Sequence, residues 1–189
     1  MQGDEIVIVS DLVEGVPLHD HVLGNVRLPL LEATGILKQV ASGLAGALAR
    51  GVVHGNLKAH NVLVTELREV RLTDFGQGQG DAGTMTHYVA PERARQGATP
   101  PGDLYACGVL WYFMLAGVPP FAGVSPEEVR AARAASRAIP LSRRVAGLPA
   151  GADALFTRLT QREPARRTPG TAALMADLDL LENGELERS

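Results

Sequence analysis

The chain has 189 residues, a formal net charge of −3, 46% hydrophobic residues and one cysteine. This length suits one domain with a substantial core, and the slightly acidic charge argues against a nucleic-acid-binding surface. The single Cys107 excludes an internal disulfide framework and is typical of a reducing compartment. Asp4 and Glu5 lie where a secretory leader needs basic residues, and glycines interrupt the longest apolar run, around 104–118. We therefore expect a cytoplasmic protein with no membrane segment in this chain.

The first part of the chain alternates short strands with helices. Residues 5–10 are a β-branched run that predicts a strand, and a short helix is expected around 18–23. Apolar residues then recur at helical spacing from Leu30 to Arg50, which predicts a long buried helix ended by Gly51. The short strands expected after this helix are residues 62–64 and 70–72.

The second part is mainly helical. Residues 103–116 are almost wholly apolar, which predicts a helix that is buried on every side. Ser125-Pro126-Glu127-Glu128 is a capping box with proline at the first helical position, so another helix should begin there. Further helices are expected at 150–161 and at 169–182, the second opening after Thr168, and residues 183–189 should be a frayed tail. The fold class predicted is α+β, mainly α.

Several short motifs follow one another in a definite order. Residues 54–64 read His-Gly-Asn-Leu-Lys-Ala-His-Asn-Val-Leu-Val, and Asp74-Phe75-Gly76 begins ten residues later. The motifs after them are Ala90-Pro91-Glu92, Asp103-Leu104-Tyr105-Ala106-Cys107-Gly108, Gly117-Val118-Pro119-Pro120-Phe121 and Glu163-Pro164-Ala165-Arg166-Arg167. This series resembles the protein kinase family, in which the first two motifs are the catalytic loop and the metal-binding loop.

The resemblance implies an architecture and a nucleotide site. Residues 16–182 would form the helical C-terminal lobe of a kinase, and residues 1–15 would be a hinge-like strand and linker ahead of it. The residues implied at the nucleotide and its metal are Asp11, Val13 and Leu63 beside adenine, and Asn61 and Asp74 as ligands of Mg²⁺.

The same resemblance implies structural roles for other residues. His54 would support Phe75, Asp103 would hydrogen bond to the catalytic-loop backbone near His54, and Glu92 would pair with Arg167. Lys58 lies two residues after the catalytic position and matches the serine/threonine branch of the family, of bacterial type.

Two positions depart from the family pattern His-Arg-Asp. Asn56 takes the place of the aspartate that accepts the substrate hydroxyl proton, and an amide has no basic lone pair near neutral pH. Loss of a general base costs about 10²- to 10⁴-fold in rate. Gly55 takes the place of the arginine that binds an activation-loop phosphate in many kinases. About ten residues precede the hinge-like segment, so this sequence supplies no N-terminal lobe with its glycine-rich loop and strand lysine.

Three functional hypotheses stay open at this point. The first is a catalytically impaired, pseudokinase-like domain with a regulatory or partner-binding role and weak or absent ATP and Mg²⁺ binding. The second is a fragment of an active ATP-dependent serine/threonine kinase whose N-terminal lobe lies upstream. The third is a scaffold that another polypeptide completes, covering the apolar face around residues 6–8 and Leu63. A protein partner or a protein substrate is expected in each case.

Overall fold

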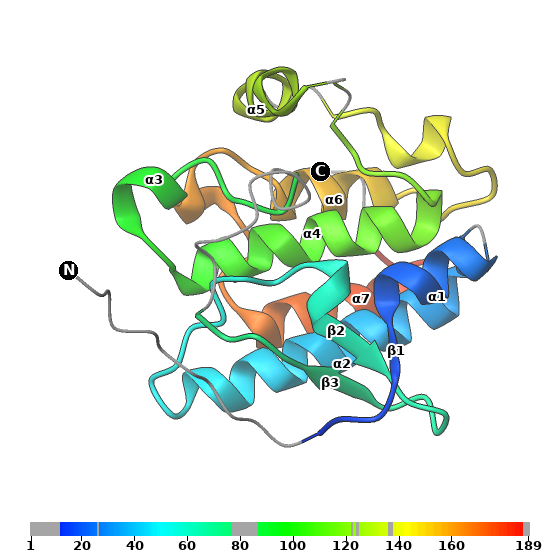
Figure 1. The fold of residues 1–189 in the computed structure, drawn as a ribbon. Coiled ribbons are helices and arrows are strands. Elements are labelled where there is room, and N and C mark those ends of the chain that lie inside the picture. Colours follow the sequence, from blue (N-terminus) through cyan, green and yellow to red (C-terminus); the bar gives the residue numbers. More distant parts are fainter. Residues whose placement is uncertain are drawn as a thin grey trace.

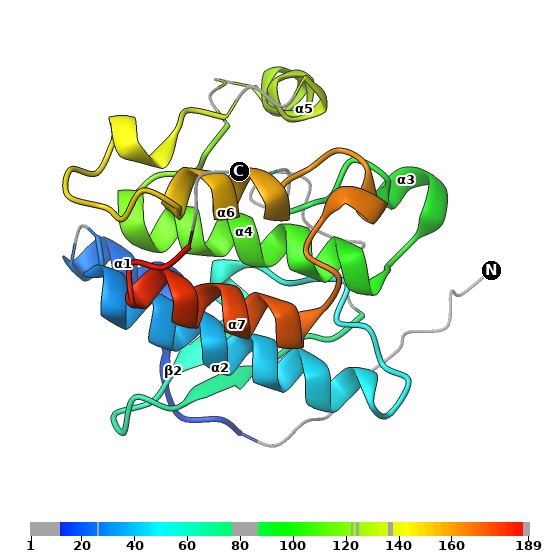
Figure 2. The same cartoon turned by 180° about the vertical axis from the view of Figure 1, so that it is seen from behind.

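The computed structural model describes residues 12–25, 27–76, 87–121, 123, 125–135 and 138–186. These residues form a mainly helical unit with one small antiparallel sheet (Figure 1). Helix α4 (Pro100–Ala116) runs through the middle, between α6 (Ala152–Leu159) and α2 (Leu30–Leu48). Figure 2 shows α7 (Thr171–Glu182) beside α2, on the face opposite the sheet. The other helical elements are α1 (Leu18–Asn25), η1 (Ala59–Asn61), α3 (Arg93–Gln96), α5 (Pro126–Ala134), η3 (Leu141–Arg143) and η4 (Pro164–Arg166).

Helix α4 is buried on all sides, as its apolar sequence predicts. Every residue from Asp103 to Leu115 is buried. At Gly108 a β-carbon would lie 2.8 Å from Cβ of Leu159, so the absence of a side chain lets α6 approach closely. Because packed helices on both sides hold α4, the residues of its first turn have a fixed position in the domain.

Several helix ends differ from the sequence predictions. Helix α4 begins at Pro100, earlier than the predicted residue 103, because the Thr99 hydroxyl caps it by accepting a hydrogen bond from the Gly102 amide at 3.2 Å. Helix α2 ends at Leu48, before the predicted Arg50. Helix α7 begins at Thr171 with Gly170 at its N-cap, two residues after the predicted start. The capping residue predicted for α5 is correct, since Ser125 accepts from the Glu128 amide at 3.2 Å.

The sheet pairs one strand that precedes α1 with two strands that follow α2. Strands β2 (Val62–Val64) and β3 (Val70–Leu72) lie where the sequence predicts them and pair antiparallel. Strand β1 (Val16–Pro17) pairs antiparallel with β2 on its other edge and was not predicted, because two residues give no periodicity. The strand predicted at residues 5–10 lies outside the described residues.

The described end of the chain packs on the domain. Residues 184–186 hydrogen bond through their amides to carbonyls at the end of α7, and Leu186 packs against the core. Residues 187–189 of the predicted tail lie outside the described part of the chain.

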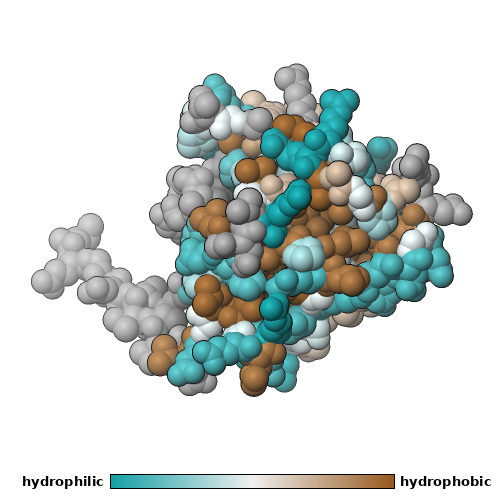
Figure 3. Space-filling model, turned by 90° about the vertical axis from the view of Figure 1, so that its right-hand side faces the viewer, coloured by the Kyte–Doolittle hydropathy of each residue, from teal (hydrophilic) through white to brown (hydrophobic). Residues whose placement is uncertain are grey.

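The surface mixes polar and apolar areas. Figure 3, which faces the right-hand side of Figure 1, shows apolar surface near its centre with hydrophilic side chains around it. Large exposed apolar side chains include Leu12, 92% exposed, ahead of β1, and Val16, 50% exposed, in β1. Among the described helices, none combines the length and the apolar character that crossing a membrane requires.

Candidate catalytic and metal-binding loops

The loop between α2 and η1 is attached to the first turn of α4 through Asp103. The backbone amides of His54 and Gly55 each donate a hydrogen bond to the Asp103 carboxylate, both at 2.9 Å. Burial raises the pKa of Asp103, and these two hydrogen bonds oppose that rise by stabilising the charged form. The contact that the resemblance implies for Asp103 is therefore present.

His54 is fully buried and stacks on the ring of Phe75, with ring centroids 4.2 Å apart. Its Nδ1 accepts a hydrogen bond from the Asn56 amide at 3.2 Å. Burial lowers the pKa of His54 to about 4, although the charge of Asp74 and a backbone hydrogen bond favour its charged form. A neutral imidazole packed on Phe75 matches the supporting role expected from the sequence, and it is not poised for proton transfer at neutral pH.

Asn56 lies at the centre of this loop and is 6% exposed. Its side-chain nitrogen Nδ2 donates a hydrogen bond to the backbone carbonyl of Asp74 at 3.2 Å. Its backbone carbonyl accepts a hydrogen bond from Nδ2 of Asn61 at 2.8 Å. Its side-chain oxygen Oδ1 is buried without a hydrogen-bond partner in the described structure. The amide therefore bridges the catalytic and metal-binding loops instead of presenting a base.

The two predicted metal ligands lie at the same end of the β2–β3 hairpin. Asn61 immediately precedes β2, Asp74 follows β3 by two residues, and the Thr73 amide donates to the Asn61 carbonyl at 3.0 Å. Because Asn61 uses its amide nitrogen in the bond to Asn56, its side-chain oxygen is the atom left for a cation. An amide oxygen and the exposed Asp74 carboxylate are the ligand types that Mg²⁺ prefers, so these residues fit the metal.

The remaining predicted site residues lie around these loops. Lys58 is half-buried just before η1, and its carbonyl accepts from the Asn61 amide at 2.9 Å. Leu63 is half-buried in β2, where it is paired with Pro17, and Val13 is half-buried ahead of β1. Asp11 lies outside the described residues. The β1–β2 pairing brings Pro17, in the segment after Val13, beside Leu63.

Glu92 and Arg167 form a buried bidentate ion pair. The guanidinium nitrogens lie 2.6 and 2.7 Å from the two carboxylate oxygens, and the side chains are 2% and 0% exposed. Arg167 also donates to the carbonyls of Gln161 and Pro101, both at 2.8 Å, and its guanidinium lies over the Tyr105 ring. This network fixes the segment that follows residue 90 to the helical core.

The close packing around Gly55 was not predicted from the sequence. Its φ is +66°, and a β-carbon there would lie 2.7 Å from Cβ of Ala98 and 3.0 Å from Nη1 of Arg93. The Arg93 guanidinium therefore lies against the position where the family pattern has an arginine side chain. No local signal predicts this, because Arg93 is far from Gly55 in the sequence and no spacing rule relates them.

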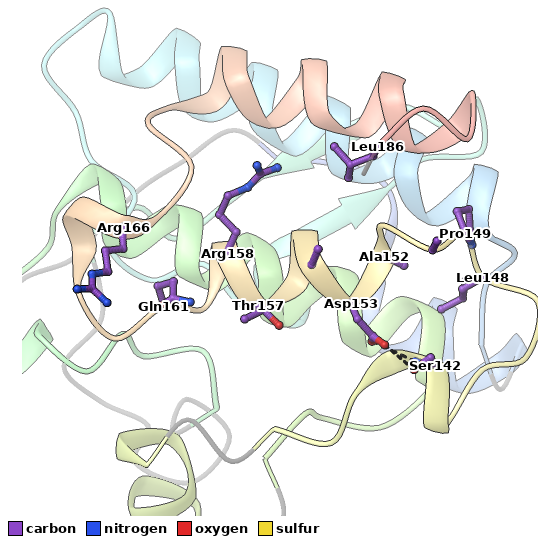
Figure 4. A pocket seen from close by; sticks show the side chains of 12 residues that line it. Ser142, Leu148, Pro149, Ala152, Asp153, Thr157, Arg158, Gln161, Arg166 and Leu186 are labelled. Atoms are coloured by element: carbon purple, nitrogen blue, oxygen red, sulfur yellow. Dashed lines mark hydrogen bonds between the residues drawn. The ribbon is translucent and has the colours of Figure 1, made fainter. Parts of the chain in front are cut away.

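A separate groove lies along α6, away from the catalytic loop (Figure 4). It has a volume of about 740 Å³ and runs from Leu186 and Leu148 at one end to Arg166 at the other. The Ser142 amide donates to Asp153 at its rim at 3.2 Å. No residue of the two loops described above lines it.

Comparison with known proteins shows which family and which relatives this chain is similar to. The family model described as the protein kinase domain matches residues 1–177. The chain is 28% identical to the serine/threonine-protein kinase PrkC of Bacillus subtilis, covering 94% of this chain and 29% of that protein. It is 32% identical to PknL of Mycobacterium tuberculosis (95% and 48%) and 30% identical to PknB of the same organism (94% and 30%). The chain thus spans less than half the length of each of these curated relatives.

A solved structure shares the fold. The crystal structure of Rad53 residues 1–466 in complex with AMP-PNP superposes with a TM-score of 0.75 at 25% identity. The match covers 87% of this chain and 44% of the other. The helical lobe with a small strand pair beside the loops, expected from the sequence, is therefore confirmed.

Proposed function

Because the chain belongs to the protein kinase domain family, we propose that it is a kinase-like domain impaired in phosphoryl transfer, with a regulatory or partner-binding role. The observation that carries this proposal is Asn56, whose amide takes the position of the general base and donates a hydrogen bond from Nδ2 to the Asp74 carbonyl. His54 does not replace it as a base, because burial keeps its ring neutral and it is packed against Phe75.

Weak binding of ATP with Mg²⁺ is part of this proposal. When bound, Mg²⁺ supplies charge neutralisation on the phosphates. Asp74 and Asn61 would hold it, and the hairpin end fixes their backbones next to each other. The half-buried Leu63 would contribute one side of the adenine site.

A thermal-shift titration combined with a transfer assay tests the proposal. We expect ATP with Mg²⁺ to raise the melting temperature slightly or not at all, and Asp74→Ala to abolish any rise. Incorporation of radiolabel from ATP into a general protein substrate should stay at background. Turnover that Asp74→Ala abolishes would defeat the proposal. A matched control is Asp153→Ala, a half-buried aspartate at the α6 groove that should change neither readout.

A second candidate is a part of an active serine/threonine kinase. Its support is that the contacts which hold the loops in place are intact, namely Asp103 to the loop backbone and Glu92 to Arg167. The relatives are named as serine/threonine-protein kinases and are longer than this chain. Joining a glycine-rich N-terminal lobe of a relative to residue 1 and finding transfer to protein serine or threonine would favour this candidate.

The partner in either case is a polypeptide. Val16 is exposed in β1, which pairs with β2, and Leu12 is exposed ahead of β1, so another chain could cover this face. Monomeric behaviour without aggregation at high concentration would contradict the need for such a cover. The buried thiol of Cys107 supports the cytoplasm as the compartment that we propose.

A further inference from the structure

We propose that the groove along α6 binds an extended acidic segment of a partner protein, with an apolar side chain of that segment at one end and a carboxylate at the other (Figure 4). The groove has a volume of about 740 Å³, within the range of about 300–1,000 Å³ that is usual for ligand sites. The inference rests on the partner-binding part of the proposed function and adds to it a surface and the chemistry of the partner.

The groove is basic, although the whole chain is slightly acidic. The stretch from η3 through η4 contains five arginines and two acidic residues. Asp153 is already engaged, because its carboxylate accepts hydrogen bonds from the amide and the hydroxyl of Ser142. Arg158 is engaged as well, in an ion pair with Asp177 at 2.6 Å. Arg166 is exposed at one end of the groove and forms no ion pair within the described part of the chain. The charge left over is positive, which favours a negatively charged occupant.

The opposite end of the groove is apolar. Leu148 and Pro149 come from the loop between η3 and α6, and Leu186 reaches the groove from beyond α7 (Figure 4). Leu186 lies so close to α6 that a β-carbon at Gly151 would be 2.6 Å from its carbonyl oxygen. Because Leu148 and Leu186 also pack against the core, this end is a fixed apolar wall, where an apolar side chain of the partner would be removed from water.

Helix α6 sets the spacing between the two ends. Its eight residues span about 12 Å, because a helix rises about 1.5 Å per residue. An extended segment rises about 3.3 Å per residue, so its apolar and acidic side chains should lie about four residues apart. Between the ends, the side chains of Thr157 and Gln161 line the groove and can hydrogen bond to the backbone amides of the segment.

The lining favours a polypeptide over a nucleic acid. A phosphodiester backbone offers nothing to the apolar end at Leu148 and Leu186. Among the described residues that line the groove, none has an aromatic ring on which a base could stack. A protein segment supplies both the apolar side chain and the carboxylate.

Fluorescence anisotropy with a labelled synthetic peptide tests the proposal on the unmodified chain. The peptide carries a leucine and, after three serines, two glutamates. We expect saturable binding with a dissociation constant of about 0.1–1 mM for so short a contact, and weaker binding at higher salt. Replacing the glutamates of the peptide with lysines should abolish binding. Replacing its leucine with serine should weaken binding about fivefold.

A charge reversal in the chain locates the binding site. Arg166→Glu should weaken binding of the peptide about fivefold to tenfold, because it turns an attraction into a repulsion. The matched control is Arg50→Glu, the same change in charge at an exposed position just beyond α2, which should leave binding unchanged. Equal binding by Arg166→Glu and the unmodified chain would overturn the proposal, as would the absence of saturable binding by the unmodified chain at millimolar peptide.

NMR on the unmodified chain gives a second measurement that needs no variant. Addition of the peptide should shift the backbone amide signals of Thr157 and Gln161, and shifts confined to other regions would contradict the proposal. A single-stranded oligonucleotide and phosphatidylserine vesicles serve as comparison probes, and tighter binding of either one than of the peptide would also overturn it. Failure of these binding tests leaves the proposed loss of phosphoryl transfer standing, because the transfer assay measures that loss separately.

Discussion

The residues that support the candidate site and the residues of the catalytic loop itself differ in how fully their buried polar groups are hydrogen bonded. Glu92, Arg167 and Asp103 are buried charges whose hydrogen-bonding groups are matched by charged or backbone partners. In the loop, by contrast, Asn56 keeps one buried oxygen without a partner in the described structure, and Gly55 has a left-handed backbone.

Holding the catalytic loop in place and performing chemistry with it are therefore separable. Asp103 binds backbone amides, which every residue type provides, so its contacts do not depend on the side chains at positions 55 and 56. The fold can therefore keep its shape while the residue at position 56 changes from a base to an amide.

Removal of Arg167 should produce the largest effect. Arg167→Ala leaves the Glu92 carboxylate buried and uncompensated, so the free energy of unfolding should fall by about 3–5 kcal/mol. Urea unfolding followed by circular dichroism measures it. The control is Arg71→Ala, which removes an exposed pair with Glu69 and should cost less than about 1 kcal/mol. Equal losses in the two variants would show that the Glu92–Arg167 pair does not hold the segment to the core.

A pH series on His54 tests whether the loop is built around a neutral ring. Burial lowers the pKa of His54 to about 4 from an ordinary 6.5, so its contribution to stability is fully present above pH 6.5 and is lost as the pH falls through 4. The wild type should lose about 3 kcal/mol more than His54→Phe between these values. Urea unfolding of both proteins at each pH gives the difference, in which other titrating groups cancel. Parallel curves would mean that this histidine is not buried as a neutral ring.

Much of the fold was predictable, because its signals are local. Strands β2 and β3 and the buried helix α4 follow from β-branched runs and apolar periodicity, and the Ser125 cap follows from its motif. The start of α7 was predicted two residues too early, because Thr168 followed by Pro169 resembles an N-cap with proline at the first helical position. The N-cap is Gly170 instead. The contacts of Asp103 and Glu92 were expected from the resemblance that the ordered series of motifs carries. The approach of Arg93 to Gly55 depends on packing between distant segments, which no pattern in the sequence encodes.

Asp103→Asn tests the attachment of the loop to α4. Asparagine offers one acceptor oxygen and turns an NH₂ donor toward the second backbone amide, so one of the bonds to His54 and Gly55 is lost and two donors face each other. The expected loss is about 2 kcal/mol, measured by urea unfolding. Asp153→Asn is the matched control, because Asp153 also accepts from a backbone amide, that of Ser142, but at an exposed site. If both variants lose the same stability, the buried attachment has no special importance.

The smallest effect should come from adding a methyl group at Gly55. Both Gly55 and Gly51 have left-handed backbones, with φ of +66° and +74°, so alanine at either position costs about 1 kcal/mol in strain. At Gly51 nothing lies within 4 Å of the added carbon, whereas at Gly55 it would meet Ala98 at 2.7 Å. Gly55→Ala should therefore be less stable than Gly51→Ala by about 1 kcal/mol.

The size of the stability difference between Gly55→Ala and Gly51→Ala shows whether the catalytic loop has room for the arginine of the family pattern at position 55. Arg93 can move aside, because its guanidinium ends a flexible side chain, but Cβ of Ala98 is attached directly to the backbone. Equal stability of Gly55→Ala and Gly51→Ala would mean that the segment around Ala98 yields and that residue 55 is free to change. A larger loss at Gly55, relieved in the double variant Gly55→Ala with Ala98→Gly, would show that the loop has been repacked around the missing side chain.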